Sequence, residues 1–166
     1  VRGQDSVLYF EHKKLYRTIK GEVPDDDYTV PIGKAEIRRA GRDLTVITYG
    51  YMVHISLQAA EELAKKGIDC EVIDLRTLLP LDKEAILASV RKTNKVAVVH
   101  EDKRTMGIGA EIAAIIAEEA FDDLDAPIAR ITGPDIPIMP FSPPLEDFFI
   151  LDASEVAQGL EKLARY

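Results

Sequence analysis

Cysteine, basic residues and long apolar runs are all scarce in this sequence of 166 residues. Its single cysteine, Cys70, excludes an internal disulfide. We expect Cys70 to be buried and to act as a small apolar residue. A chain without disulfides fits the reducing, cytoplasmic compartment. Lys and Arg number 21 against 29 Asp and Glu, and the net charge of -8 disfavours attraction to nucleic acid phosphates. No apolar run approaches the roughly 20 residues of a membrane span. We therefore expect neither a nucleic acid nor a membrane as partner.

The acidic excess is concentrated in two segments, residues 25–27 and residues 118–125. Clustered carboxylates of this kind can meet a basic protein surface, and they can also form an ordinary solvated face. Three adjacent aspartates on one short loop lack the spaced alternation of a calcium site, so we expect a solvated turn at 25–27.

Short β-branched runs alternate with amphipathic helical segments from residue 44 onward. Four runs predict strands: residues 44–49, 70–75, 95–100 and 128–132. Three segments predict helices: residues 52–64, residues 82–93, and a third that begins at the Gly-Ile-Gly sequence of 107–109. This alternation requires crossover connections, so we predict an α/β fold with a mostly parallel open sheet and helices on both faces.

Smaller signals refine this prediction. Asp82 is a helix N-cap candidate, and Asp152 and Glu155 have the spacing of a capping box that starts a last helix, which should pack on the sheet. We expect residues 35–39 and 44–49 to form a hairpin that adds an antiparallel edge strand. A proline-rich passage runs from residue 133 to residue 144.

The first part of the chain differs in character from the rest. Residues 11–32 are rich in Lys, Asp, Pro and Gly and sustain no helical or strand period, which indicates a linker with a boundary near Ile32. An expected strand at residues 7–10 precedes this linker, and the sequence has no initiator methionine. We expect a fragment of a longer polypeptide.

Several residues could support chemistry. Gly50 and Asp74 imitate a dinucleotide fingerprint, but Met52 and Ile55 stand where that motif needs glycines. The glycines of 106–109 could bind an anion or permit close helix packing, and we favour packing. The three histidines have no metal-ligand spacing. His100 beside Glu101 could act as a general base, yet no nucleophile is placed near it in sequence, so we prefer an interface or hydrogen-bonding role.

An ordered set of motifs resembles one family along nearly the whole chain. The matching segments are residues 10–17, 21–24, 28–35, 45–50, 74–82, 100–102, 109–112, 124–127 and 132–137. They resemble the beta subunit of thiamine-diphosphate-dependent 2-oxo acid dehydrogenases. The ending at 136–144, with Glu146 and Phe148, is most similar to the branched-chain enzymes of prokaryotes, and pyruvate or acetoin dehydrogenase is the alternative.

The resemblance implies a transketolase C-terminal-like domain at residues 32–166, preceded at 1–31 by the end of a pyrimidine-binding domain and a linker. It implies thiamine diphosphate and magnesium in a parent α2β2 heterotetramer, held by regions outside this segment, so no catalytic residue is assigned here. The implied partners are the alpha subunit, a second beta subunit and the subunit-binding domain of the dihydrolipoyl acyltransferase. Asp125 and the terminal carboxylate on Tyr166 correspond to acceptors for basic residues of that domain. Asp125 could instead only order a turn before Pro127.

The resemblance implies oxidative decarboxylation with acyl transfer to lipoamide for the parent complex, and an inactive segment in isolation. We weigh two functions of other classes against this. One is a noncatalytic interaction module, which fits the segment alone, and the other is a nucleotide-binding oxidoreductase, which depends on fold analogy. A transketolase or a deoxyxylulose phosphate synthase matches the linker and the 124–127 motif less closely.

Overall fold

The computed structural model describes residues 6, 8 and 10–166 of the chain. It divides into two units, residues 1–30 and residues 31–166. In the first unit, the described residues are mostly exposed and include one short helix, α1 (Leu15–Thr18). Of the strand expected at 7–10, positions 7 and 9 lie outside the described residues, and Leu8 and Phe10 belong to no strand.

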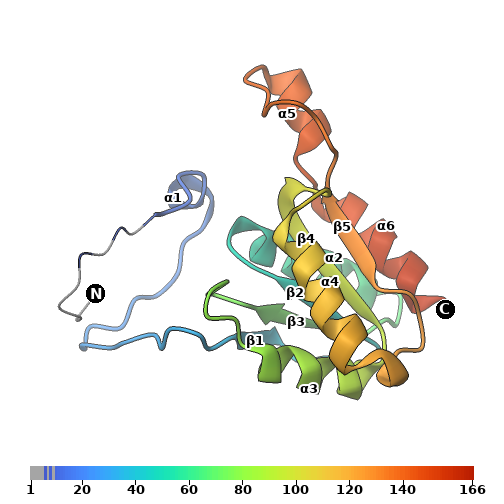
Figure 1. The fold of residues 1–166 in the computed structure, drawn as a ribbon. Helices are drawn as coiled ribbons and strands as arrows, with labels where there is room; N and C mark the ends of the chain where they lie inside the picture. The colour runs from blue at the N-terminus through green and yellow to red at the C-terminus, as the bar shows by residue number, and fades with distance from the viewer. Residues whose placement is uncertain (1–5, 7, 9) are drawn as a thin grey trace. The chain divides into compact units, whose positions relative to one another are not determined.

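The second unit is built on one five-stranded sheet (Figure 1). Its strands are β1 (Glu36–Arg39), β2 (Leu44–Thr48), β3 (Cys70–Asp74), β4 (Val96–Lys103) and β5 (Ala129–Gly133). They lie in the order β1-β3-β2-β4-β5, and every pair is parallel except β1 with β3. All five residues of β2 are buried, as expected of a central strand covered on both faces. The predicted α/β class and mostly parallel sheet are confirmed.

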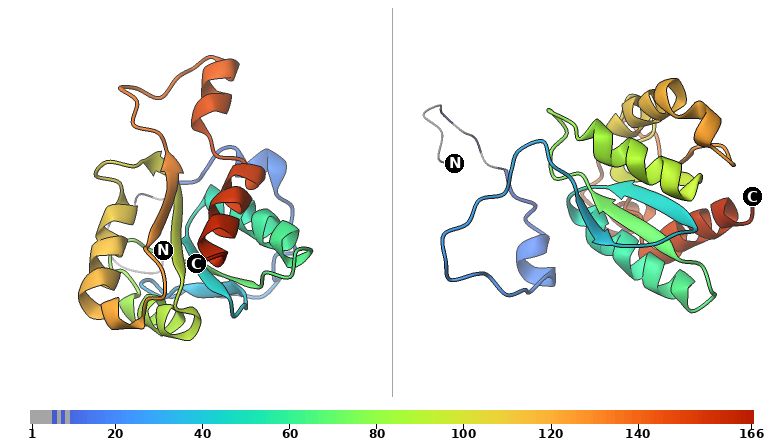
Figure 2. Two further views of the ribbon diagram at one scale, coloured as in Figure 1. Left: turned by 90° about the vertical axis from the view of Figure 1, so that its right-hand side faces the viewer. Right: turned by 90° about the horizontal axis from the view of Figure 1, so that it is seen from below.

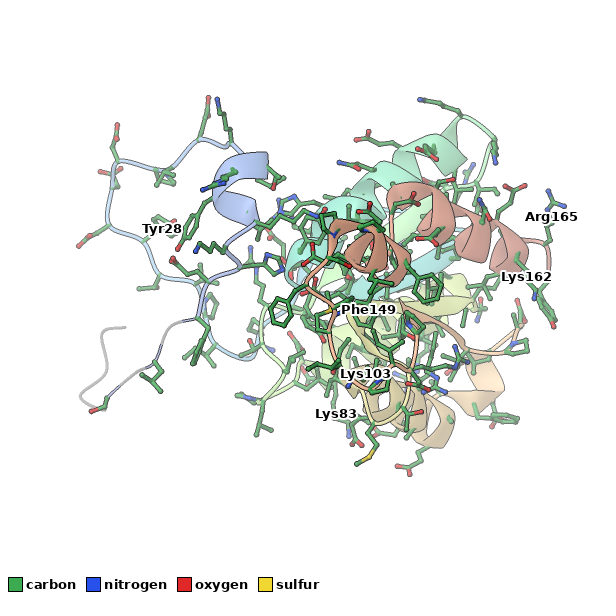
Figure 3. The ribbon with its side chains drawn as sticks, turned by 90° about the horizontal axis from the view of Figure 1, so that it is seen from above. Tyr28, Lys83, Lys103, Phe149, Lys162 and Arg165 are labelled. Atoms are coloured by element: carbon green, nitrogen blue, oxygen red, sulfur yellow. The ribbon has the colours of Figure 1, made fainter. Side chains whose placement is uncertain are left out.

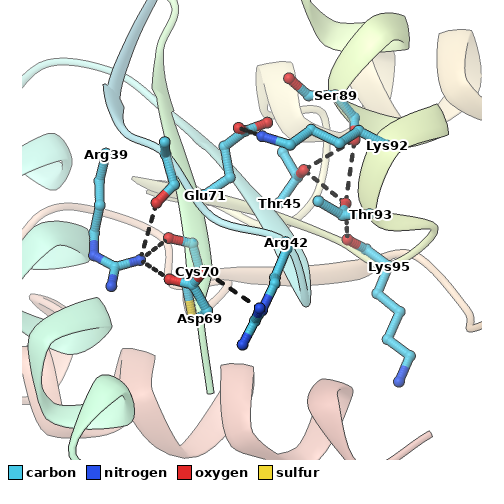
Figure 4. A network of polar contacts seen from close by, with 11 residues as sticks. Arg39, Arg42, Thr45, Asp69, Cys70, Glu71, Ser89, Lys92, Thr93 and Lys95 are labelled. Atoms are coloured by element: carbon cyan, nitrogen blue, oxygen red, sulfur yellow. Dashed lines mark hydrogen bonds and ion pairs between the residues drawn. The ribbon is translucent and has the colours of Figure 1, made fainter. Parts of the chain in front are cut away.

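The predicted hairpin between residues 35–39 and 44–49 is wrong. The edge strand β1 is antiparallel as expected, but its partner is β3, with Glu36 opposite Asp74 and Ile37 opposite Ile73. The chain between β1 and β2 crosses over the start of β3, where a Cβ on Gly41 would lie 2.2 Å from the Glu71 amide nitrogen. Arg39 holds this crossing by donating to the carboxylate of Asp69 at 2.9 Å and to the Cys70 carbonyl (Figure 4).

Helices cover both faces of the sheet (Figure 2). On one face, α2 (Tyr51–Ala64) and α6 (Ala153–Ala164) pack in a cluster with Leu44, Val46 and Val99. On the other, α3 (Lys83–Thr93) and α4 (Ile108–Glu119) pack around Ile47 and Val98. Burying apolar surface on both faces stabilises the three-layer arrangement.

The two N-caps named from the sequence are confirmed. The Asp82 carboxylate accepts the Ala85 amide at 3.3 Å and begins α3, and it also accepts the Ala35 amide at 3.0 Å. Asp152 accepts the Glu155 amide at 2.7 Å, while the Glu155 side chain accepts the Asp152 amide at 3.0 Å. This reciprocal capping box fixes the start of α6.

A buried polar group ties α3 to the sheet (Figure 4). Glu71 on β3 is fully buried, and Lys92 on α3 reaches it with its ammonium group. The hydroxyls of Thr45 and Thr93 lie 2.7 Å apart, and each also lies within 3.2 Å of the Ser89 carbonyl. Truncating Lys92 would leave the buried Glu71 carboxylate without its ion-pair partner, so we assign Glu71 and Lys92 a structural role.

The passage between β5 and α6 contains a helix that the prolines did not predict. α5 (Pro143–Phe149) begins at a proline, because the first turn of a helix does not need the amide that proline lacks. We call residues 134–149 the arm, and Figure 1 shows α5 standing away from the sheet. Phe149, labelled in Figure 3, is buried. Its ring packs on Gly133, where a Cβ would lie 2.9 Å from it. No helix in the described part of the chain is long and apolar enough to cross a membrane.

Candidate functional site

Asp125 lies in the loop that leads from the 3-10 helix η1 (Phe121–Asp123) to β5. Asn94, the left-handed residue that ends α3, holds this loop in place. The Asn94 carbonyl accepts the Asp125 amide at 2.8 Å, and the Asn94 side chain donates to the Asp123 carbonyl at 2.7 Å. The backbone of Asp125 is therefore fixed while its carboxylate is exposed.

A mostly apolar hollow of about 690 Å³ lies beside this loop. Its lining residues are Ala117, Phe121, Asp122, Leu124, Asp125, Ala126, Pro127 and Ile128. The Phe121 ring is 70% exposed. The Asp123 carboxylate does not line this hollow and instead forms an ion pair with Arg91 at 3.3 Å. We call this feature the acidic hollow, and its form suits a partner that offers an apolar contact beside a basic side chain.

Tyr166 is exposed and lines a second hollow of about 290 Å³. Three cationic side chains, Arg104, Arg130 and Lys162, also line it, and we call it the basic hollow. The two hollows share Pro127 and Ile128. The structure thus places the two residues singled out from the sequence, Asp125 and Tyr166, on neighbouring parts of one surface.

Sequence reasoning missed the cations and the aromatic ring of this surface. Arg104 follows the paired part of β4, Arg130 is in β5, and Lys162 is in the last turn of α6. These residues are far apart in the sequence and belong to no periodic pattern. Only the packing of α6 against the edge strand β5 brings them together.

His100 and Glu101 do not form the base that their adjacency could suggest. His100 is buried in β4, its Nε2 accepts the Gly109 amide at 3.3 Å, and the Tyr49 ring stacks at a centroid distance of 6.4 Å. A Cβ on Gly107 or Gly109 would lie within 2.8 Å of the imidazole ring, so these glycines permit close packing of α4. The hydrogen-bonding role of His100 and the packing role of the glycines are both confirmed.

Burial sets the ionisation of this group and of the cysteine. Desolvation lowers the pKa of His100 below its ordinary value and outweighs the nearby Asp102, which favours the charged form. Burial raises the pKa of the Cys70 thiol to about 11, so it stays protonated and unreactive at neutral pH. Cys70 is buried in β3 as expected.

No three or more His, Cys, Asp or Glu side chains among the described residues are grouped so that they could hold a metal ion. Asp25, Asp26 and Asp27 are exposed. We derive no catalytic step from the described residues.

Residues 33–156 match the family model of the transketolase C-terminal domain. The chain belongs to this family. Within it, the chain is 55% identical over all 166 residues to the 2-oxoisovalerate dehydrogenase subunit beta of Bacillus subtilis, covering 51% of that protein. It is 44% identical over the same length to the pyruvate dehydrogenase E1 component subunit beta of the same organism, covering 50% of it.

The chain spans about half the length of the curated relatives it matches. Its relatives are beta subunits of 2-oxo acid dehydrogenases. Among solved structures, it is similar to a split gene transketolase described as an inactive beta4 tetramer, with a TM-score of 0.74 and 26% identity. That match covers 87% of this chain and 46% of the other.

Proposed function

We propose that this chain is the C-terminal part of the beta subunit of a branched-chain 2-oxo acid dehydrogenase. In this proposal, residues 1–31 are the end of a pyrimidine-binding domain and a linker, and residues 32–166 are the transketolase C-terminal-like domain. The parent complex, an α2β2 heterotetramer in the cytoplasm with thiamine diphosphate and magnesium, decarboxylates branched-chain 2-oxo acids oxidatively and transfers the acyl group to lipoamide.

One comparison carries the choice of substrate. Two relatives from the same organism match the same 166 residues, and the 2-oxoisovalerate enzyme is 55% identical where the pyruvate enzyme is 44% identical. Both relatives come from one organism, so the distance between species is the same for both. The difference in sequence identity therefore reflects the substrate branch of the family. A pyruvate or acetoin dehydrogenase is the alternative.

The test of this choice uses the full-length beta chain purified with its alpha partner. We expect kcat/KM for 3-methyl-2-oxobutanoate to exceed that for pyruvate by at least about tenfold, a ratio that its two extra methyl groups can give in a hydrophobic pocket. A preference for pyruvate would keep the family and replace the substrate.

We also propose that this segment serves assembly and docking of the acyltransferase. Asp125 is the acceptor that we assign to a basic residue of the acyltransferase subunit-binding domain, and Tyr166 is the second contact. The exposed Asp125 carboxylate on a fixed backbone supports this, because a held acceptor forms charge-assisted hydrogen bonds at a small entropic cost.

Asp125→Ala tests the docking role in the full-length heterotetramer. We expect the dissociation constant of the subunit-binding domain to rise by about tenfold or more, since a charge-assisted contact is lost, while decarboxylation of the 2-oxo acid stays unchanged. Glu62→Ala, which removes an exposed carboxylate on α2, is the matched control. Equal affinity of Asp125→Ala and the parent would leave Asp125 only a turn-ordering role.

A further inference from the structure

The arm, residues 134–149, begins and ends at the same point of the sheet. Gly133, the last residue of β5, pairs with Lys103 of β4 after an irregularity in the register of these strands. At the other end of the arm, the buried Phe149 ring lies so close that a Cβ on Gly133 would be 2.9 Å from it and 2.9 Å from the Glu101 carbonyl oxygen. The arm is therefore a loop with closely spaced ends, and we call its contacts with the ends of β4 and β5 the root.

A second contact joins the root to the loop between β4 and α4. One oxygen of the Asp135 carboxylate accepts the Thr105 amide at 2.9 Å, and the other accepts the Thr105 hydroxyl at 2.7 Å. We call these two hydrogen bonds the clasp. They lower the pKa of the Asp135 carboxyl group, so it is charged at neutral pH and the clasp is charge-assisted. In the same loop, Arg104 donates to the Arg130 carbonyl of β5 at 2.9 Å.

The loop that carries Thr105 has little freedom of its own. Met106 has a φ of 61°, in the left-handed region that side chains other than glycine seldom adopt. A Cβ on the following Gly107 would clash with the Lys103 carbonyl oxygen and with the His100 ring. Such a backbone persists where its surroundings over-determine it, so Thr105 offers its amide and its hydroxyl from a fixed position.

The sequence of the arm also restricts its internal freedom. Proline fixes φ near -65°, and the arm has prolines at positions 134, 137, 140, 143 and 144. A stiff arm turns about its root, and such a turn would move the exposed side chains of Phe141 and Phe148 together. The orientation of these apolar side chains therefore depends on the contacts at the root.

We propose that the clasp between Thr105 and Asp135 sets the orientation of the arm, so that its exposed apolar side chains are placed for a partner subunit before assembly begins. Asp135 and Thr105 are then positioning residues, which act through Phe141 and Phe148. This inference rests on the proposed role of the segment in subunit assembly and adds how the arm is prepared for it. A preorganised element loses less conformational entropy on binding, so opening the clasp should weaken assembly without removing an apolar contact.

The experiment measures the dissociation constant between the full-length beta chain and its alpha partner by sedimentation at increasing dilution. We expect Asp135→Ala to raise this constant by about fivefold to tenfold and Thr105→Val by about threefold, because the clasp loses both bonds in the first and the hydroxyl bond in the second. Thr105→Ser keeps both donors and should stay within about twofold of the parent. Asp147→Ala, which removes an exposed carboxylate from α5 and not from the root, is the matched control.

The free energy of unfolding of each variant separates positioning from a general loss of structure. We expect it to stay within about 0.5 kcal/mol of the parent, because Thr105 and Asp135 are exposed. Unchanged assembly in Asp135→Ala, equal assembly in Thr105→Val and Thr105→Ser, or an equal loss in Asp147→Ala each overturns the clasp.

The double variant Phe141→Ser with Phe148→Ser, measured in the same series, separates this inference from the proposed function. Weaker assembly in the double variant with unchanged assembly in Asp135→Ala overturns the clasp and keeps the assembly role of the arm. Unchanged assembly in both overturns the two together. Weaker assembly in both, with rescue by Thr105→Ser, supports both.

Discussion

At the scale of single residues, the close contact between His100 and the start of α4 decides how that helix sits on the sheet. The imidazole occupies the space that a side chain at position 107 or 109 would need. The buried ring satisfies the Gly109 amide, one of the amides that the first turn of α4 leaves without an intrahelical partner. A catalytic histidine needs access to substrate, and this one is enclosed.

Gly109→Ala tests this packing. The added methyl group would lie 2.5 Å from the His100 Nε2 atom, so either α4 or the ring must shift. We expect the free energy of unfolding to fall by about 1–3 kcal/mol, as for overpacked cores, measured by urea denaturation. Gly21→Ala is the control, since no atom lies within 4 Å of a Cβ there. Equal stability of the two variants would mean that the ring does not restrict α4.

His100 also makes stability depend on pH. Burial lowers the pKa of His100 in the folded protein. The unfolded chain therefore binds a proton at His100 near pH 6.5, whereas the folded chain binds it only at a lower pH. The stability that neutral His100 contributes is therefore present above pH 6.5 and is lost as the pH falls below that value. We expect the parent to lose more stability between pH 7 and pH 5 than His100→Gln, whose amide oxygen can still accept the Gly109 amide. Parallel pH profiles of the two proteins would contradict this.

At the scale of elements, the helix caps were predicted correctly, whereas the partner of β1 and the helix α5 were not. Asp82 and Asp152 mark the starts of α3 and α6 because a cap uses only residues within one turn. The pairing of β1 with β3 depends on contacts of Arg39 with Asp69 and Cys70, about 30 positions further along the chain. The sequence of residues 35–49, which could also form a hairpin, does not indicate these contacts. α5 was missed because prolines usually end helices, and here Pro143 begins one.

The arm is the element whose exposure most needs an explanation. Phe141 and Phe148 are 91% and 69% exposed, and they line a hollow of about 460 Å³ with Ile136, Ile138, Met139, Pro140 and Leu145. Apolar patches of this kind mark interaction surfaces. We assign the arm to subunit assembly within the proposed heterotetramer.

Replacing both rings, as Phe141→Ser with Phe148→Ser, should weaken assembly of the full-length beta chain with its partners and leave its own fold intact, because neither ring is buried in it. Light scattering after size-exclusion chromatography would show a shift toward smaller species at micromolar concentration. Met106→Ser is the control, since Met106 is 95% exposed and lies outside the arm. An unchanged assembly in the double variant would remove the arm from the interface.

At the scale of the whole molecule, the sequence was enough for the fold class and for part of the candidate site. Alternating strands and helices of these lengths can form only a parallel sheet with crossovers, so the class followed from the pattern. Asp125 and Tyr166 were named through the family resemblance. Phe121, Arg130 and Lys162 could not be named, because their proximity depends on how α6 and the η1–β5 loop flank β5, which no local pattern encodes.

In the proposed function, this half of the beta subunit assembles and docks, while the catalytic groups lie elsewhere. The most direct test compares thiamine-diphosphate-dependent decarboxylation of 3-methyl-2-oxobutanoate by the alpha subunit mixed with either the full-length beta chain or residues 1–166. The account predicts turnover with the full-length chain and none above background with residues 1–166, folded as judged by circular dichroism. Turnover with residues 1–166 at a comparable rate would contradict it.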